Sequence, residues 1–238
     1  MKIEVLADDG LVAERAASVI AEQAREAIAA RGAFVMAVSG GHTPWIMLRR
    51  LAAAPIPWGA VHIVQVDERV APAGHPDRNL THLRQSLADA PLPPDQLYAM
   101  PVESTDLEAA AGSYASALRK IAGEPPIIDL VHLGLGPDGH TASLVPGDPV
   151  LDVNNADVAL SGPYQGRRRM TLTYPIINRA RRILWVVTGG EKAAMVDRLL
   201  MGDFSIPAGR VSAGQALLLA DSAAAGQRSS KTGEVTCV

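Results

Sequence analysis

Cysteine is almost absent from this chain of 238 residues, in which Cys237 is the only one. A lone cysteine cannot form an intramolecular disulfide or a cysteine-rich metal site, and at this terminal position it is a poor candidate for a catalytic thiol. Aromatic residues are also few, with two Phe, three Trp and four Tyr, and the formal net charge is -3. Without a basic tail or an aromatic-rich basic surface, we expect no nucleic-acid partner.

Long apolar runs are missing as well, since none approaches the roughly 18 residues that a membrane span needs. The first residues, MKIEVLA, contain an acid and no small-residue cleavage site, so we expect a first strand there and not a signal peptide. These features predict a soluble, cytoplasmic protein without a membrane partner. Metal-ligand spacings, a Gly-x-Ser-x-Gly elbow and a complete Walker loop are absent, which argues against a metal site, a serine hydrolase and a nucleotide hydrolase.

Strand-like apolar runs alternate with segments of helical periodicity along the chain. The expected strands are 3–7, 34–38, 61–66, 128–133 and 183–187, and the expected helices are 11–30, 44–51 and 106–121. Because the strand-like runs are β-branched and apolar throughout, they suit parallel strands covered on both faces by helices. We therefore predict an α/β fold with a doubly wound, mostly parallel sheet in three α/β/α layers. We expect a single domain over 1–221, followed by a polar, flexible tail over 222–238.

Glycine-rich and charged segments follow several of these strands. The carboxyl ends of parallel strands meet at one edge of a sheet, where ligands bind, so we expect four such loops to converge. The first is Ser39-Gly40-Gly41-His42-Thr43-Pro44. Its glycines free backbone N–H groups and Pro44 suits a first helical turn, which fits a phosphate cradle or an ordinary strand-to-helix turn. Of these two interpretations, the Thr43 hydroxyl favours the phosphate cradle, because a hydroxyl can donate a hydrogen bond to phosphate.

The second loop, Asp67-Glu68-Arg69 with 74–79 shortly after, is dense in ionisable groups. It is either a ligand site or a solvated loop of paired charges, and its position at a strand end favours a site. The third, 134–143, carries Asp138 two residues before His140, where the acid could orient the imidazole as a base. His62 and His132 lie inside apolar strands, where buried, hydrogen-bonded histidines are expected.

The fourth loop combines Arg167-Arg168-Arg169-Met170-Thr171-Leu172-Thr173 with Thr188-Gly189-Gly190-Glu191-Lys192. Arginine offers a bidentate fork to phosphate, and Lys192 in a first helical turn adds a point charge. Of the three consecutive arginines, we expect one in the site and two in solvent.

Together these loops resemble the glucosamine-6-phosphate isomerase/6-phosphogluconolactonase family over most of the chain. The resemblance rests on five motifs in the family's order: 39–44; Asp67-Glu68-Arg69 with His75 and Asn79; 138–147, which reads DGHTASLVPG; Arg169-Met170-Thr171-Leu172-Thr173; and Gly189-Gly190-Glu191-Lys192. The chain departs from the family pattern at His42, Arg78 and Val145.

The resemblance implies hydrolysis of a sugar-phosphate lactone, 6-phosphoglucono-δ-lactone, with no cofactor and no metal. It implies that His140 is the general base on water, oriented by Asp138, and that Asp67 and Arg69 assist the reaction. The implied phosphate-binding residues are Ser39, Gly40, Gly41, Thr43, Arg169 and Lys192. Further substrate contacts are expected from His42, Arg78, Asn79 and Gly136. We expect a monomer or a small homo-oligomer.

Two alternatives stay open at this point. The isomerase/deaminase members of the family use an acid five residues after the motif histidine, and here that residue is Val145, which cannot carry a proton. Arg69 also matches the lactonase form of the second loop. The second alternative is a non-catalytic sugar-phosphate sensor of the same fold, which would carry a separate DNA-binding module. We expect no such module here, because the expected first strand starts at the beginning of the sequence, and this disfavours the sensor.

Overall fold

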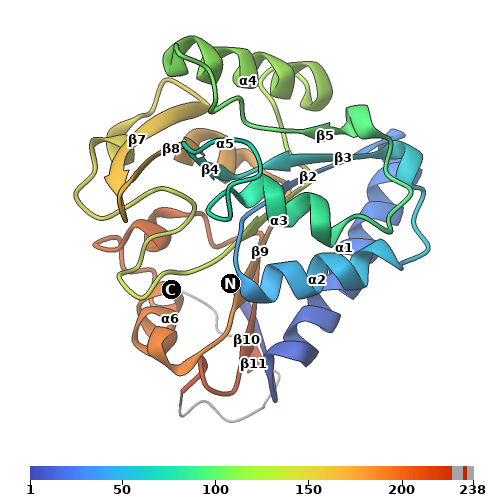
Figure 1. The fold of residues 1–238 in the computed structure, drawn as a ribbon. Coiled ribbons are helices and arrows are strands. Elements are labelled where there is room, and N and C mark those ends of the chain that lie inside the picture. The colour runs from blue at the N-terminus through green and yellow to red at the C-terminus, as the bar shows by residue number, and fades with distance from the viewer. Residues whose placement is uncertain (227–232, 235–238) are drawn as a thin grey trace.

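The computed structural model describes residues 1–226 and 233–234. In this part of the chain, the main sheet has eight strands in the order β11-β1-β10-β9-β6-β2-β3-β5 (Figure 1). Their bounds, in chain order, are β1 Lys2–Leu6, β2 Phe34–Val38, β3 Val61–Gln65, β5 Leu97–Tyr98, β6 Leu130–Leu133, β9 Arg182–Val187, β10 Ala216–Asp221 and β11 Gly233–Glu234. All neighbouring pairs are parallel except β11 with β1. The predicted doubly wound, mostly parallel sheet is therefore confirmed.

The expected strand over 34–38 has the predicted bounds, and the other expected strands begin and end within two residues of them. In the main sheet three strands were not predicted, namely the two-residue β5 and β11 and the apolar run of β10. β10 is an inner strand between β1 and β9, in the half of the sheet that lies away from β3.

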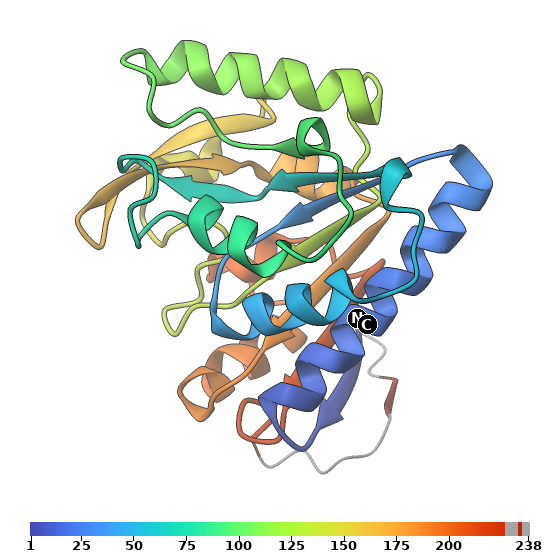
Figure 2. The same ribbon diagram turned by 45° about the vertical axis from the view of Figure 1, so that its right-hand side comes forward.

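Helices cover both faces of the sheet, with α4 on one side and α1 and α2 on the other (Figures 1 and 2). Their bounds are α1 Asp9–Arg31, α2 His42–Ala52, α3 Asn79–Ser86, α4 Leu107–Ala122, α5 Tyr174–Arg179 and α6 Ala193–Leu200. Short 3-10 helices lie at Trp58–Ala60, Pro94–Gln96, Pro149–Asp152, Gly190–Lys192 and Pro207–Arg210. Alternate side chains of β2 enter different cores: Phe34 and Met36 pack with α1 and α2, whereas Val35 and Ala37 pack with α4, α5 and α6. Both faces are thus buried, as a parallel strand requires.

A second, antiparallel sheet has the order β4-β8-β7 and consists of Asp67–Arg69, Arg167–Leu172 and Val158–Tyr164 respectively. The prediction that Arg167 to Thr173 is a loop was therefore wrong. Met170 and Leu172 are fully buried in the core that the main sheet shares with α4, and they alternate with polar residues in the period of a strand. This small sheet places Arg169 opposite Arg69 across the β4–β8 pair.

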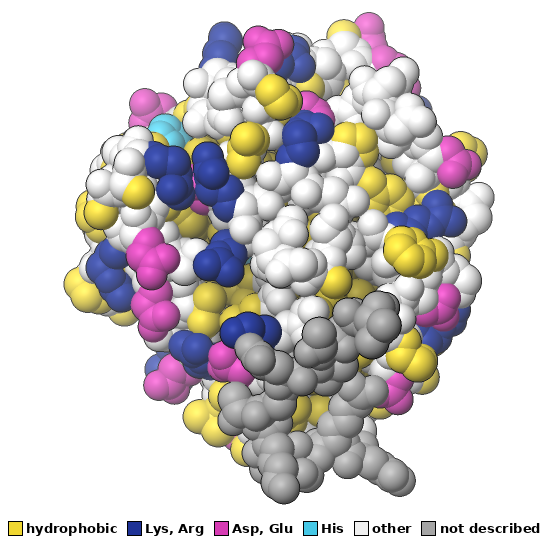
Figure 3. Space-filling model, turned by 180° about the vertical axis from the view of Figure 1, so that it is seen from behind, with side chains coloured by type: hydrophobic (Ala, Val, Ile, Leu, Met, Phe, Trp, Pro, Cys, Tyr) yellow, Lys and Arg dark blue, Asp and Glu magenta, His cyan; other side chains and the backbone are white. Residues whose placement is uncertain are grey.

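Residues 222–226, which we expected to belong to the tail, form a turn in which Ala224 and Ala225 are buried. The Ala224 N–H donates to Oδ1 of Asp221, 2.7 Å away, at the end of β10. The rest of the expected tail lies outside the described residues, apart from 233–234. Among the described helices, none is both long enough and apolar enough to cross a membrane. On the rear surface, Lys and Arg are interspersed with acidic, apolar and uncharged side chains (Figure 3).

Candidate active site

A cavity of about 520 Å³ opens at the carboxyl edge of the parallel sheet, where the loops after β2, β3, β6 and β9 meet the small sheet. Most of the predicted site residues line it: Ser39, Gly40, Gly41, His42, Thr43, Asp67, Arg69, Asn79, Gly136, His140, Arg169 and Lys192. Asp138 and Arg78 do not. Another cavity, of about 480 Å³, lies at the amino ends of β1, β9 and β10 and holds none of the predicted site residues.

The loop after β2 forms one wall of the cavity and leads into α2. Gly41 is the N-cap of α2, with a φ of 138° that favours glycine, and no side chain caps the helix. The first N–H groups of α2 are therefore available to an anion, and the helix dipole favours negative charge there. The His42 side chain is 82% exposed and points to Asp9, 3.9 Å away, so what His42 can offer the cavity is its backbone.

Buried contacts hold this loop in place. The Ser39 N–H donates to Nδ1 of the fully buried His132 (3.2 Å), and the Ser39 hydroxyl donates to the His132 carbonyl (3.1 Å). On the other side, the hydroxyls of Thr43 and Thr188 are 2.7 Å apart and join the loop after β2 to the loop after β9. Lys192 follows Thr188 on that second loop, lines the cavity, and makes no ion pair with another described residue.

The loop after β6 carries the histidine and its acid. Nδ1 of His140 is 2.5 Å from Oδ1 of Asp138, and the same oxygen accepts the His140 backbone N–H at 3.1 Å. Burial alone would raise the pKa of Asp138, but the hydrogen bonds from His140 outweigh it and lower that pKa. When the imidazole is neutral, an ionised Asp138 favours the tautomer with the proton on Nδ1 and the lone pair on Nε2, and Nε2 bonds no described residue. His140 lines the cavity and Asp138 does not, so Asp138 lies behind the imidazole as seen from the cavity.

Gly136 makes this pairing possible. A Cβ on Gly136 would lie 2.1 Å from Nδ1 of His140 and 2.8 Å from Oδ1 of Asp138, so the ring occupies the space that any side chain would need. Beyond His140, Ala142 has a φ of 53°, an uncommon conformation for a residue with a Cβ. The turn that it forms brings the Ser143 hydroxyl to Oδ2 of Asp67, at 2.6 Å.

Asp67 connects three segments at the bottom of the cavity. Besides the Ser143 bond on Oδ2, its Oδ1 accepts from the Asn79 amide at 3.3 Å, and its carbonyl accepts from the same amide at 3.0 Å. Burial raises the pKa of Asp67, whereas the Ser143 hydrogen bond and the charge of Arg169 oppose that rise. Gly40 packs against this arrangement, since a Cβ there would meet Oδ1 of Asn79 at 2.2 Å.

Two arginines supply positive charge from the small sheet. Arg169 is 3% exposed and its NH2 group approaches Oε1 of Gln165 at 3.3 Å, while Nε of Arg169 has no partner among the described residues. Burial lowers the pKa of Arg169, and the facing Arg69 acts in the same direction. Of the three consecutive arginines, Arg169 lines the cavity, Arg167 pairs with Asp77 at 2.9 Å, and Arg168 is exposed.

Arg78 lies outside the cavity, which corrects its prediction as a substrate contact. Its side chain is 2% exposed, its Nε is 3.1 Å from Oε2 of the fully buried Glu68, and its NH1 donates to the Ala71 carbonyl. Glu68 also accepts the backbone N–H groups of Asn79 and Leu80 at 2.8 and 2.9 Å. This buried ion pair fixes the segment between β4 and α3, so the role of Arg78 is structural.

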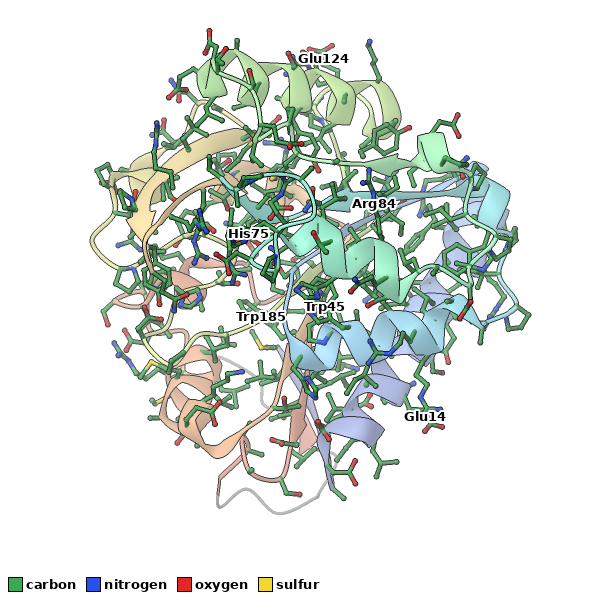
Figure 4. The ribbon with its side chains drawn as sticks, viewed as in Figure 1. Glu14, Trp45, His75, Arg84, Glu124 and Trp185 are labelled. Atoms are coloured by element: carbon green, nitrogen blue, oxygen red, sulfur yellow. The ribbon has the colours of Figure 1, made fainter. Side chains whose placement is uncertain are left out.

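The lining also includes side chains that lie outside the predicted loops, among them Trp45 and His82. Trp45 on α2, labelled in Figure 4, stacks on His82 of α3 with ring centroids 5.6 Å apart. Thr188 belongs to the fourth predicted loop and also lines the cavity, although it was not named as a site residue. The described residues contain no group of three or more His, Cys, Asp or Glu that could hold a metal ion.

One cavity is surrounded by an uncapped helix start, by arginine and lysine side chains, and by a histidine paired with a carboxylate. These features define the class of protein, an α/β enzyme for a small anionic substrate. Sequence comparison narrows the class. The family model described as glucosamine-6-phosphate isomerases/6-phosphogluconolactonase matches residues 7–219, and the chain belongs to this family.

Curated relatives and solved structures agree with this assignment. A 6-phosphogluconolactonase of Synechocystis is 37% identical over 80% of this chain and 81% of its own, and one of Streptomyces coelicolor is 35% identical over 92% of both. The structure of 6-phosphogluconolactonase from Trypanosoma brucei is 26% identical with a TM-score of 0.81, covering 94% of this chain and 97% of that one. A monomeric glucosamine-6-phosphate deaminase is 20% identical with a TM-score of 0.83, covering 96% of this chain and 100% of that one, which shows a shared fold alone.

Proposed function

We propose that this protein hydrolyses 6-phosphoglucono-δ-lactone to 6-phosphogluconate, the second step of the oxidative pentose phosphate pathway. The observation that carries the proposal is that one cavity contains both an anion-binding helix start and a carboxylate-paired histidine. The relatives named 6-phosphogluconolactonase support it. We also propose that the reaction takes place in the cytoplasm, which suits a chain without an internal disulfide.

The phosphate of the substrate binds at the loop after β2. Backbone N–H groups from Gly41 onward point toward the space ahead of α2, and the Thr43 hydroxyl adds a donor. Lys192 approaches from the loop after β9, and Arg169 adds a buried guanidinium. Because buried hydrogen bonds hold the loop after β2 in place, a phosphate bound there sets the position of the lactone carbonyl relative to His140.

The chemical step needs only an activated water, because a lactone is already electrophilic. Nε2 of His140 accepts a proton from water while the water oxygen bonds to the C1 carbonyl carbon, and the carbonyl electron pair moves to oxygen. The tetrahedral intermediate collapses as the bond between C1 and the ring oxygen breaks, and the imidazolium returns its proton to that oxygen. Asp138 stabilises the imidazolium in between.

Arg69 is the group that we propose to stabilise the negative charge developing on the carbonyl oxygen. Its backbone N–H is held by Glu68 and its NH1 by the Asp77 carbonyl, so the guanidinium is positioned before substrate arrives. Asp67 orients the substrate hydroxyls or neighbouring donors through its bonds to Ser143 and Asn79.

The deaminase reaction of the same family is less well supported. Ring opening in that reaction depends on an acid at the place of Val145. Here Val145 is 8% exposed and borders a shallow depression on the far side of Asp138, outside the His140 cavity. Lactonases and deaminases share this fold, so the residue at position 145 is what favours the lactonase activity over the deaminase activity.

A direct assay couples freshly prepared lactone to 6-phosphogluconate dehydrogenase and compares the rate with spontaneous hydrolysis. We expect acceleration with 6-phosphogluconolactone and no ammonia release from glucosamine 6-phosphate. His62 is a half-buried histidine that is bonded to Tyr98 and does not line the cavity. A His62 substitution should therefore keep the lactonase rate, and it is the matched control for a substitution of His140. A rate equal to the uncatalysed background would end the lactonase proposal.

A further inference from the structure

The hairpin between β7 and β8 places one tyrosine next to the catalytic loop. Tyr164 pairs with Arg167 across the two-residue connection Gln165-Gly166, whose φ angles of 51° and 78° are those of a type I′ turn. The strand register shifts between Ser161 and Tyr164. Irregularities of this kind redirect a side chain, and the Tyr164 side chain reaches the loop after β6.

The hydroxyl of Tyr164 contacts the pair formed by Asp138 and His140. It donates to Oδ2 of Asp138 at 3.1 Å, the oxygen that His140 does not use, and it lies 3.4 Å from Nδ1 of His140. Burial and the Asp138 carboxylate raise the pKa of Tyr164, so the phenol stays protonated and remains a donor. Asp138 is thus held through both oxygens, one by His140 and one by Tyr164.

The ring of Tyr164 makes separate contacts. It meets the His140 imidazole edge-on, with centroids 5.2 Å apart, and the guanidinium of Arg169 lies over its face, 4.9 Å from the centroid. The Arg169 NH2 group also approaches the Tyr164 carbonyl at 3.4 Å. Since Nε of Arg169 has no described partner, the aromatic face is a main support of this buried cation.

We propose that Tyr164 is a positioning residue with two separable effects: its hydroxyl aligns Asp138 and His140 for proton transfer, and its ring holds Arg169 for the substrate anion. This inference rests on the proposed function, because it assigns Tyr164 to that same site. The hydroxyl should therefore act on kcat and the ring on KM.

Two substitutions separate the effects. Tyr164→Phe keeps the ring and removes the hydroxyl, so kcat should fall roughly five- to tenfold, the rate equivalent of one partly exposed hydrogen bond to a carboxylate, with KM within about twofold. Tyr164→Leu removes both and should raise KM several-fold in addition. An unchanged kcat in Tyr164→Phe would overturn the role of the hydroxyl, and an unchanged KM in Tyr164→Leu would overturn that of the ring.

A double substitution tests whether the hydroxyl acts through Asp138. In an Asp138→Asn background, Tyr164→Phe should change kcat by less than about twofold, because the carboxylate that it aligns is gone. A purely structural effect would persist there in full and would refute the proposal. The matched control is Tyr98→Phe, which removes a hydroxyl 3.2 Å from Nδ1 of His62, outside the cavity, and should leave kcat and KM unchanged.

A measurement without substrate keeps this inference distinct from the proposed function. The Nδ1 proton resonance of His140, followed by NMR, should move in Tyr164→Phe and stay in place in Tyr98→Phe. If the wild-type protein failed to hydrolyse the lactone, the proposed function would fall, and this resonance would still decide whether Tyr164 acts on the His140 pair. An unmoved resonance in Tyr164→Phe would overturn the alignment.

Discussion

Substituting Gly136 by alanine tests whether the position of His140 limits catalysis. The new Cβ would lie 2.1 Å from Nδ1 and 2.2 Å from Cε1 of the ring, whereas ordinary contacts begin at 3.4 Å, so the ring must move by about 1.3 Å. A displacement of about 1 Å at a reacting group can cost about 100-fold in rate, and overpacking costs about 1–3 kcal/mol of stability. We therefore expect kcat to fall by about two orders of magnitude in a protein that is still folded.

The control for this experiment lies two residues earlier in the same loop. A Cβ on Gly134 would meet nothing within 4 Å, so Gly134→Ala should retain the kcat of the wild type. The coupled lactone assay gives kcat and KM for both variants, and urea unfolding gives their stabilities. If Gly136→Ala turned over at the wild-type rate, tight packing between Gly136 and His140 would not be part of catalysis, and the reasoning would be refuted.

Four further predictions follow from the site and its supports. His140→Ala should lower kcat by about two to four orders of magnitude in the lactone assay, and near-normal turnover would reject the general base. Lys192→Ala should chiefly raise KM, since its charge binds substrate and transition state alike; an unchanged KM would remove it from the phosphate site. Arg78→Met should lower the free energy of unfolding in urea by about 3–5 kcal/mol, because Glu68 stays buried without its partner, and a change below about 1 kcal/mol would contradict that. Burial lowers the pKa of His132 from 6.5 to about 3. Between these two pH values His132 is protonated in the unfolded chain and neutral in the folded protein. Stability should therefore fall as the pH drops from 6.5 toward 3, and His132→Gln should flatten that fall in urea titrations at several pH values, whereas an identical pH dependence would refute it.

The central strands could be predicted because a strand that is buried on both faces has a continuous run of apolar residues. All five residues of β2 are buried, and the glycines after that strand mark where it ends. Strand β8 was missed because charge obscured it: the segment opens with three arginines, and the strand period appears only in the alternation of Met170 and Leu172 with polar neighbours. In β8 the tertiary structure buries an arginine, which local composition does not predict.

The lining of the cavity could be predicted where a motif follows a strand, as at Gly40 and His140. Contacts between segments far apart in the sequence could not be predicted. Arg78 was expected to contact the substrate because it lies in a charged segment after a strand, and its burial instead depends on Glu68 in another element. The contact of Thr43 with Thr188 joins residues 145 positions apart. Such pairs are set by how loops meet in three dimensions, which one sequence does not record.

The pairing of β4 with β8 sets Arg69 directly opposite Arg169. Like charges facing each other across two strands repel, and Arg169 is buried where water screens that repulsion little. The buried carboxyl group of Asp67 offsets part of this repulsion, and we expect an anionic substrate bound near the two guanidinium groups to offset more of it. An anion that binds the folded protein here should therefore also raise its free energy of unfolding.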